Sequence, residues 1–79
     1  LFNALGYMNI EFGQLDKSLM YFEYAVKYYP NSANAYDSLA DFYEAKKDYV
    51  NALKQVAKAY NLSKKEYHKK RLDLFKSKI

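Results

Sequence analysis

The sequence has few residues that end or bend secondary structure: two glycines and one proline among 79 residues. A β-sandwich or barrel needs a turn signal roughly every 8–12 residues. This chain cannot supply them, which excludes an all-β fold. The absence of cysteine excludes a disulfide scaffold, a cysteine zinc site and thiol catalysis, and a single histidine disfavours a histidine metal site.

Long hydrophobic runs are also missing. No apolar stretch approaches the roughly 18–20 residues that span a bilayer, and no basic segment precedes an apolar one as in a secretory signal. The composition instead fits one small globular domain, with 51% hydrophobic and 28% charged residues. The ten tyrosines and five phenylalanines, combined with so little glycine, indicate bulky side chains packed between helices.

The chain is similar to itself at a fixed spacing of about 34 residues (the repeat interval), a period typical of stacked helical hairpins. Bulky and small positions coincide at this interval: Phe2 with Tyr36, Leu5 with Leu39, Gly6 with Ala40, Met8 with Phe42, Leu15 with Tyr49, Ser18 with Ala52, Leu19 with Leu53, Phe22 with Val56, and Ala25 with Ala59. The small residues predict that Gly6 meets Ser18, and Ala40 meets Ala52, where paired antiparallel helices approach closely.

The spacing of apolar residues predicts two helices in each unit. The four predicted apolar stripes are Phe2, Leu5, Met8 and Phe12; Leu15, Leu19, Phe22, Ala25 and Val26; Tyr36, Leu39, Phe42 and Tyr43; and Tyr49, Ala52, Leu53, Val56, Ala57 and Tyr60. Gly13 permits a left-handed turn after the first helix, and Pro30 ends the second. Asn31 or Ser32 is expected to cap the third helix, and Asp48 the fourth.

A fifth helix is predicted over about residues 64–79. Ser63 and Glu66 fit a capping box, in which the serine hydroxyl accepts from the Glu66 amide and the glutamate reaches back. The predicted apolar face consists of His68, Leu72, Phe75 and Ile79. The repeat interval fails here, so we interpret this helix as a terminal cap with a polar outer face.

The repeated bulky and small positions of the two units resemble the pattern of the tetratricopeptide repeat (TPR) family over roughly residues 1–64. The matching positions are Phe2, Leu5, Gly6, Gly13, Ser18, Phe22, Ala25 and Pro30, then Tyr36, Leu39, Ala40, Tyr43, Tyr49, Ala52 and Ala59. Departures from the family pattern are Asn9, Lys47, Val56 and Lys64. The resemblance implies a single all-α domain: two TPR-like hairpins (about 1–31 and 32–64) and the capping helix, stacked as a short right-handed α-solenoid.

A second resemblance concerns the stretch YPNSANAYDSLADFYEAKKDY. It is similar to the TPR tails that follow bacterial serine-hydrolase or esterase domains. Because Leu1 is expected to lie inside the first helix, the chain is expected to be the C-terminal piece of a longer protein. This keeps open a role as the accessory tail of a hydrolase whose catalytic domain lies elsewhere.

Catalytic motifs are absent from the chain itself. There is no G-x-S-x-G elbow, phosphate loop, G-x-G-x-x-G or H-E-x-x-H sequence. His68 has no orienting partner in the sequence and is interpreted as a packed or solvated side chain. Asp37 and Asp41 lie one helical turn apart, but nothing apolar surrounds them to make a catalytic pair. We therefore expect no enzyme activity, cofactor or metal site in this chain.

The TPR resemblance implies that the first helix of each pair lines a concave docking face. The residues on it are Asn3, Tyr7, Ile10, Glu11, Asn34, Asp37, Ser38, Asp41 and Glu44. Four of these nine are acidic and none is basic, which argues against a clamp for a peptide carboxylate. The alternative is that the acids only solvate a helix face.

Charge divides the chain unevenly. Residues 1–45 carry two lysines and six acids, a net charge of −4, whereas residues 46–79 carry eleven basic residues and three acids, a net charge of +8. A basic patch is expected on the last helix, with Lys65, Lys69, Lys70 and Arg71 at its centre. It fits a solubilising cap or a site for an acidic protein. Binding of nucleic acid or an anionic membrane through this helix is a less favoured alternative. The lack of an aromatic platform among the lysines weakens single-strand binding.

Tyr21, Tyr24 and Tyr28 form a second stripe on the second predicted helix. They either pack against the third helix or contact a neighbouring domain or a second copy. The leading hypothesis from the sequence is a non-catalytic module for protein–protein or domain–domain interaction, with a protein or peptide as its partner and self-association as an open alternative. The sequence leaves the compartment open.

Overall fold

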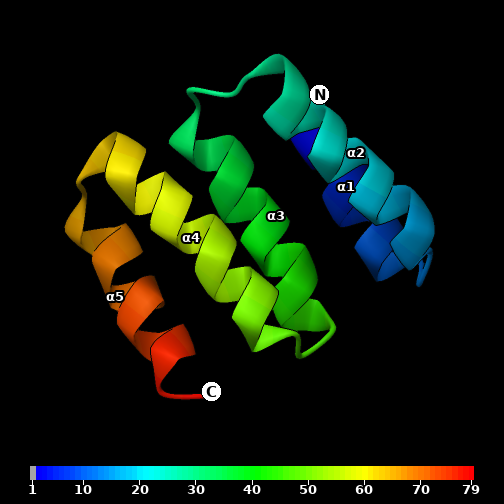
Figure 1. Cartoon of the computed structure of the whole chain (residues 1–79). Helices are drawn as coiled ribbons and strands as arrows, with labels where there is room; N and C mark the ends of the chain where they lie inside the picture. Colours follow the sequence, from blue (N-terminus) through cyan, green and yellow to red (C-terminus); the bar gives the residue numbers. More distant parts are fainter. Residues whose placement is uncertain (1) are drawn as a thin grey trace.

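The computed structural model describes residues 2–79, which form five helices joined by short connections (Figure 1). They are α1 (Phe2–Glu11), α2 (Leu15–Tyr28), α3 (Ala33–Ala45), α4 (Tyr49–Ser63) and α5 (Glu66–Lys76). No strand occurs among these residues, so the predicted all-α class is confirmed. Within the same range, no helix combines the length and the apolar character needed to cross a bilayer. The expectation that Leu1 lies inside the first helix falls outside the described residues.

The helices follow one another in space in their chain order. Each packs on the next, and α1 also contacts α3. In Figure 1, α3, α4 and α5 lie side by side, and α1 and α2 cover the opposite side of α3. This arrangement makes α3 the centre of the molecule, with neighbours on both sides.

Left-handed backbone allows the tight connections between paired helices. Gly13, between α1 and α2, has φ 73°, and Lys47, between α3 and α4, has φ 60°. The two positions are separated by the repeat interval, so a lysine holds the conformation that glycine holds in the first connection. Lys64 takes the same conformation, φ 56°, between α4 and α5. A side chain at such a position is strained, because its Cβ crowds the following carbonyl.

Two of the predicted helix caps are confirmed. Ser32 Oγ accepts a hydrogen bond from the Ala35 amide over 3.4 Å at the start of α3. Asp48 accepts from the Asn51 amide over 3.2 Å at the start of α4, and its second carboxylate oxygen accepts from the Asn51 side chain. These bonds satisfy amides that the first helical turn leaves without partners.

The core consists of two apolar clusters centred on α3. One joins Phe22 of α2 to Leu39 and Phe42, with Ile10, Leu15, Leu19, Val26 and Tyr43 packed around them. The other joins Ala40, Ala52, Val56 and Phe75, with Tyr43, Tyr49, Leu53 and Leu72 packed around them. Most residues of the stripes predicted for α2, α3 and α4 therefore face the interior.

Small residues set the distance within each pair of helices, as predicted. Ser18 donates a hydrogen bond of 2.9 Å to the Gly6 carbonyl across α1 and α2. A Cβ added at Gly6 would clash with the Phe22 ring, so a larger residue would force that buried ring to shift. Ala40 and Ala52 are fully buried in one cluster, which is the equivalent approach between α3 and α4.

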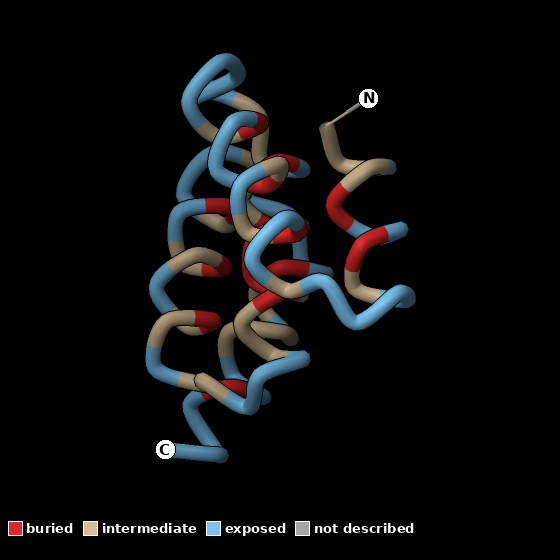
Figure 2. The backbone as a smooth tube through the Cα atoms, turned by 90° about the vertical axis from the view of Figure 1, so that its right-hand side faces the viewer, coloured by how far each residue is buried: buried red, intermediate tan, exposed pale blue. Residues whose placement is uncertain are grey.

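The stripe predicted for α1 is wrong at its C-terminal end. Met8 is 47% exposed and Phe12, which lies beyond the helix, is 69% exposed. The buried residues of α1 are Gly6 and Asn9 instead. Figure 2 shows the buried positions of the N-terminal helix on the side that faces the rest of the molecule. Among residues 2–79, no helix covers the other side of α1, so apolar side chains there meet solvent.

The capping box predicted at the start of α5 is also wrong. Ser63 belongs to the last turn of α4, and α5 begins at Glu66 after Lys65, whose side chain forms no capping bond. The left-handed Lys64 turns the chain so tightly that Ser63 Oγ accepts from the Lys65 amide instead, over 3.1 Å.

The face predicted for α5 is correct except at its last residue. His68 and Phe75 are buried, and Leu72 is partly buried against α4. Ile79 lies beyond the end of the helix and is exposed. It therefore contributes nothing to the core.

Two residues of the second tyrosine stripe of α2, Tyr24 and Tyr28, pack on α1. The Tyr24 ring lies 5.8 Å from the Phe2 ring, and the Tyr28 ring stacks on Phe2 at 6.0 Å between centroids. Both tyrosines remain partly open to solvent. For these two tyrosines the expected packing against the third helix is wrong, because Phe2 of α1 supplies their partner.

Candidate functional site

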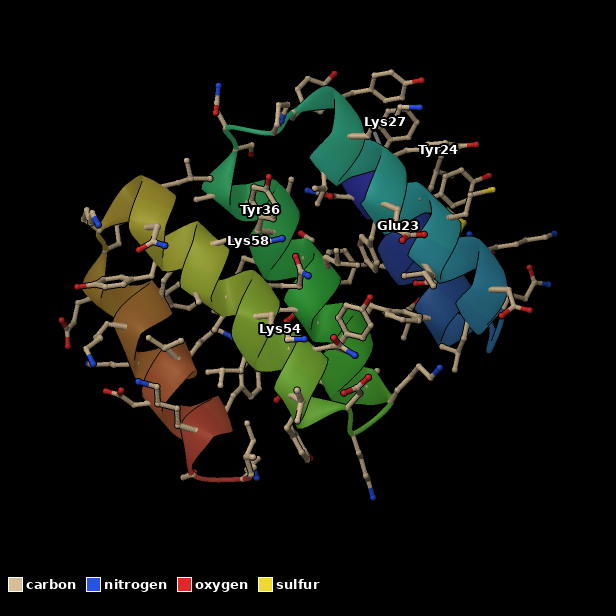
Figure 3. All side chains as sticks on the ribbon, viewed as in Figure 1. Glu23, Tyr24, Lys27, Tyr36, Lys54 and Lys58 are labelled. Atoms are coloured by element: carbon tan, nitrogen blue, oxygen red, sulfur yellow. The ribbon has the colours of Figure 1, made fainter. Side chains whose placement is uncertain are left out.

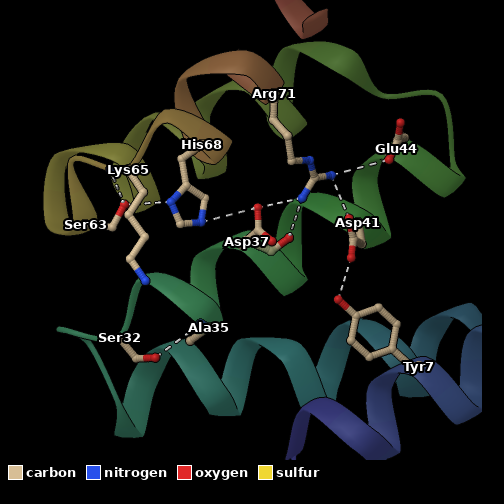
Figure 4. A network of polar contacts seen from close by, with 10 residues as sticks. All are labelled: Tyr7, Ser32, Ala35, Asp37, Asp41, Glu44, Ser63, Lys65, His68 and Arg71. Carbon is tan, nitrogen blue, oxygen red and sulfur yellow. Dashed lines mark hydrogen bonds and ion pairs between the residues drawn. The ribbon is translucent and has the colours of Figure 1, made fainter.

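The most connected polar group of the structure joins α3 to α5. The Arg71 guanidinium donates to Asp37 and to Asp41, each over 2.6 Å, and to Glu44 over 3.4 Å (Figure 4). The three acids lie on one face of α3 because they are spaced one helical turn apart. The Arg71 side chain is only 13% exposed. It therefore sits between the helices and does not project into solvent.

The acids of α3 stabilise the charged form of Arg71. Burial by itself lowers the pKa of Arg71, but the negative charges of Asp41 and Asp37 outweigh it and raise the pKa above its ordinary value. A second bond from Arg71 reaches the Asp37 backbone carbonyl at 3.4 Å. A planar guanidinium with several donors suits such a multiple contact better than a lysine.

Tyr7 extends this network to α1. Its hydroxyl donates a hydrogen bond to Asp41 Oδ2, while Asp41 Oδ1 accepts from Arg71 (Figure 4). Burial, followed by the hydrogen bond to Asp41, raises the pKa of Tyr7 well above its ordinary value. The hydroxyl thus stays protonated and keeps donating. Asp41 is the common partner through which α1, α3 and α5 meet on one face.

His68 occupies the other end of this face. Its Nδ1 lies 2.6 Å from Ser63 Oγ, and its Nε2 lies 3.8 Å from Asp37 Oδ1 (Figure 4). The sequence indicated no orienting partner for His68, and the structure provides one in Ser63, on the other side of the α4–α5 connection. His68 is buried, so the packed interpretation is correct.

The trio of Ser63, His68 and Asp37 has the residue types of a hydrolase triad but not its geometry. The 3.8 Å separation from Asp37 is too long for a hydrogen bond, and the same carboxylate oxygen already accepts from Arg71. The Ser63 oxygen also accepts from the Lys65 amide. A nucleophile needs a base that is itself oriented by a third group. These contacts instead hold the α4–α5 connection in place.

An open pocket of about 470 Å³ lies beside His68, at the N-terminal ends of α3 and α5. Its lining residues are Ala33, Asn34, Asp37, Ser63, Lys65, Tyr67 and His68. Tyr67 is largely exposed and forms an aromatic wall. The pocket continues the face that carries the Arg71 network, because Asp37 belongs to both.

Five of the nine residues predicted for the concave face come together here, whereas Ile10 packs on the cluster of Phe22 and Ser38 is buried. Tyr7, Asp37, Asp41 and Glu44 form the network with Arg71, and Asn34 lines the pocket. Asn3 and Glu11 do not join it in the part of the chain that the structure describes. Asn3 lines a separate cavity of about 70 Å³ together with residues of α2 and α3, and Glu11 is exposed.

The predicted basic patch is divided by the fold. Arg71 turns inward to α3, and Lys69 forms an ion pair of 3.0 Å with Asp73 on its own helix. Lys65 and Lys70 remain exposed. The sequence analysis missed that Arg71 neutralises part of the acidic face. A signal for it existed, because Arg71 follows Asp37 by the repeat interval, which also separates Tyr7 from Asp41.

Comparison with models of known protein families gives no match, and comparison with curated proteins gives none either. The function therefore has to be argued from the geometry of this chain alone.

Proposed function

We propose that this chain is a TPR-like module that binds a protein or peptide on the face formed by α1, α3 and α5. In this proposal α1–α2 and α3–α4 are two equivalent hairpins, stacked as a short right-handed solenoid. Their connections support it, since Gly13 and Lys47 hold the same left-handed conformation at the repeat interval. Their close approaches support it too, since Gly6 meets Ser18 where Ala40 meets Ala52.

The ring at the start of each hairpin gives further support. The Phe2 ring packs on Tyr24, and one repeat interval later the Tyr36 ring lies under Lys58 Nζ at 5.7 Å. Both contacts join the first turn of one helix to the second helix of its pair. Figure 3 shows Tyr24, Tyr36 and Lys58 on the side of the molecule where α2 and α4 face the viewer.

In the same proposal, α5 caps α4 and takes the place that the first helix of a further unit would have. Its inward residues, His68, Leu72 and Phe75, occupy the places of Ala35, Leu39 and Phe42 with a spacing one less than the repeat interval. The reason is the length of chain between helix starts. From the start of α4 to the start of α5 it is one residue shorter than from the start of α2 to the start of α3. The ion pair of Lys69 with Asp73 makes the outer edge of this helix polar, as a terminal cap requires.

One observation carries the proposed binding role: three acids of α3 converge on one face around a single arginine. Arg71 satisfies Asp37, but the Asp41 side chain is 33% exposed and that of Glu44 is 42% exposed. The face thus keeps a net negative charge towards solvent. A partner with lysine or arginine fits it, whereas a peptide carboxylate would be repelled.

The pocket beside His68 defines the second contact of the bound partner. The pocket lies at the N-terminal end of α3, whereas Glu44 lies near the C-terminal end of the same helix. Tyr67 offers an apolar surface in the pocket. We therefore propose an extended peptide whose basic residue faces Asp41 and Glu44 and whose apolar residue enters the pocket against Tyr67. The module performs no chemical step in this proposal.

A titration followed by ¹⁵N NMR tests this proposal. The isotope-labelled chain is titrated with two short amidated peptides that have the same apolar residues, one carrying arginines and the other glutamates. We expect the arginine peptide alone to shift the amide signals of α1, α3 and α5. Glu44→Gln should weaken its binding, and Glu23→Gln, at the exposed position of α2 labelled in Figure 3, should not. Equal responses to both peptides, or to both substitutions, would contradict the proposed face.

A further inference from the structure

His68 and Arg71 of α5 share one carboxylate oxygen on α3. Arg71 donates to Asp37 Oδ1 over 2.6 Å, and His68 Nε2 lies 3.8 Å from the same oxygen (Figure 4). All three side chains are nearly buried, with 9% of His68, 12% of Asp37 and 13% of Arg71 exposed. Charges in such surroundings are screened much less than charges in water. A change in the charge of His68 is therefore felt by the pair that Arg71 forms with Asp37.

The hydrogen bonds around His68 indicate which ring nitrogen carries the hydrogen. Ser63 Oγ accepts from the Lys65 amide over 3.1 Å, so the hydroxyl hydrogen is free to donate to His68 Nδ1, 2.6 Å away. On the other side of the ring, Nε2 faces the negative carboxylate of Asp37, which favours a hydrogen on Nε2. Because the partner of one ring nitrogen sets the state of the other, these contacts fit the uncharged ring with its hydrogen on Nε2.

The ring has access to protons from solvent. Although His68 is buried, it lines the open pocket of about 470 Å³. A proton taken up from water on Nδ1 would make both ring nitrogens donors, and the Ser63 hydroxyl would turn so that its oxygen accepts from Nδ1. The titratable, charged or hydroxyl groups that surround the ring are Asp37 of α3, Ser63 of α4, Lys65 of the connection, and Tyr67 and Arg71 of α5.

His68 is the single histidine of the sequence, which has no cysteine. Histidine is the side chain that ordinarily changes its charge between about pH 5 and pH 8. Aspartate and glutamate ordinarily titrate below this range, and tyrosine and lysine above it. A response of the acidic face within this range therefore points to one side chain.

We propose that His68 is a pH switch of the acidic face: the uncharged ring permits binding of the basic peptide, and a proton on the ring weakens it. The inference rests on the binding role proposed above for Asp41 and Glu44. Three acids and one arginine leave this face a net charge of −2, which a charged His68 reduces to −1. The charged ring also competes with Arg71 for Asp37 Oδ1, and Arg71 then neutralises the other two acids more fully.

Both contacts of the proposed peptide favour the uncharged ring. The apolar residue in the pocket would exclude water from His68, and loss of water disfavours a charged histidine. The arginine beside Asp41 and Glu44 would repel a further positive charge nearby. Binding should thus weaken as the pH falls. Because coupling between two sites is reciprocal, a bound peptide should in turn shift His68 towards its uncharged form.

The NMR titration with the arginine peptide, repeated at about pH 8 and about pH 5.5, tests the switch. The arginines of the peptide stay charged at both values. We expect binding to be about threefold or more weaker at the lower pH, the effect of one added charge near a surface site. His68→Gln, whose amide does not titrate, should bind the peptide equally at both pH values. Lys70→Gln is the matched control at an exposed position of α5 and should keep the pH dependence.

The unsubstituted protein gives a second measurement, which does not require His68→Gln to fold. The ring signals of His68 and the side-chain Nε–H signal of Arg71 are followed by NMR over the same pH range without peptide. Both should change with one common midpoint. At a pH where both forms of His68 are present, added peptide should move the ring signals towards their high-pH positions.

Three results would overturn the switch: peptide binding that is equal at the two pH values, equal weakening in His68→Gln, or an Arg71 signal that does not follow His68. The proposed binding face survives each of them, provided that the arginine peptide binds. Failure of this peptide to bind at either pH would instead reject the binding face, and the switch with it.

Discussion

The Arg71 guanidinium on α5 donates a hydrogen bond of 2.6 Å to the Asp37 carboxylate on α3, and both side chains are nearly buried. This contact spans two helices that are not neighbours along the chain. It places a basic group where three acids meet, and it couples the end of the chain to its centre. Because Asp41 also accepts from Tyr7, the same arginine is linked through that carboxylate to α1.

Removing Arg71 should destabilise the fold more than removing any exposed lysine. In Arg71→Met, Asp37 and Asp41 would remain as neighbouring buried or half-buried acids without a counter-charge. Breaking a buried ion pair on one side costs about 3 kcal/mol or more. Urea unfolding of Arg71→Met beside Lys70→Met, an exposed position on the same helix, measures this. Similar midpoints for both variants would show that the network contributes little to stability.

Enlarging Ala52 should overpack the α3–α4 approach. Ala52 is fully buried against Ala40, so the three extra carbons of a leucine have no room. Ala52→Leu should lower the free energy of unfolding by about 1–3 kcal/mol, as forced insertions into packed cores do. Ala45→Leu, at an exposed position of α3, is the comparison. An unchanged melting temperature of Ala52→Leu would refute close packing at this point.

Replacing the strained lysine in the α3–α4 connection should stabilise the protein. Lys47 has φ 60°, which glycine adopts without strain, as Gly13 does at the equivalent place. We expect Lys47→Gly to raise the free energy of unfolding by about 0.5–1 kcal/mol. Lys46→Gly should lower it instead, because Lys46 has φ −86° and needs no glycine. Thermal unfolding of both variants distinguishes the two signs.

Acid should remove the contribution of the α4 cap within a defined pH range. The hydrogen bonds from the Asn51 side chain and amide lower the pKa of Asp48. Since the folded pKa is below the unfolded one, the cap contributes fully above about pH 4, the ordinary range of an aspartate. The contribution is lost as the pH falls through the lowered folded pKa.

Comparison with Asp48→Asn isolates this titration. Asparagine also caps helices but carries no proton that titrates in this range. The wild-type protein should lose more stability than Asp48→Asn as the pH is lowered below about 4. Parallel pH profiles in denaturant unfolding would mean that the Asp48 carboxylate is not responsible.

The helices and most of their inward faces follow from local pattern. Pro30 ends α2, Ser32 and Asp48 cap the helices that follow them, and stripes such as Leu39 and Phe42 recur at helical spacing. The repeat interval also located the close approaches at Gly6 and Ala40. These features are determined by residues within a few turns of one another, which is why the sequence alone predicted them.

The remaining features depend on contacts that a local pattern does not contain. Met8 has the right spacing for a core residue, but no helix among residues 2–79 covers it. Ser63 has the sequence of a helix cap, but the left-handed Lys64 keeps it in α4 and brings His68 to it. Of the acids predicted for one face, Asp37, Asp41 and Glu44 lie together and Glu11 does not join them, and Arg71 reaches this face from another helix.

The stacking of each helix on its neighbours in the chain also bears on how the protein forms. Within each pair, only a short turn separates the helix ends, so the partners meet after closing a very small loop. Few native contacts join segments that are far apart along the polypeptide, so the loss of chain entropy on closing loops is small. Topologies of this kind fold in microseconds to milliseconds. The bonds of Arg71 to α3 are among the most distant to close, and we expect them to be absent from the transition state and to slow unfolding rather than speed folding.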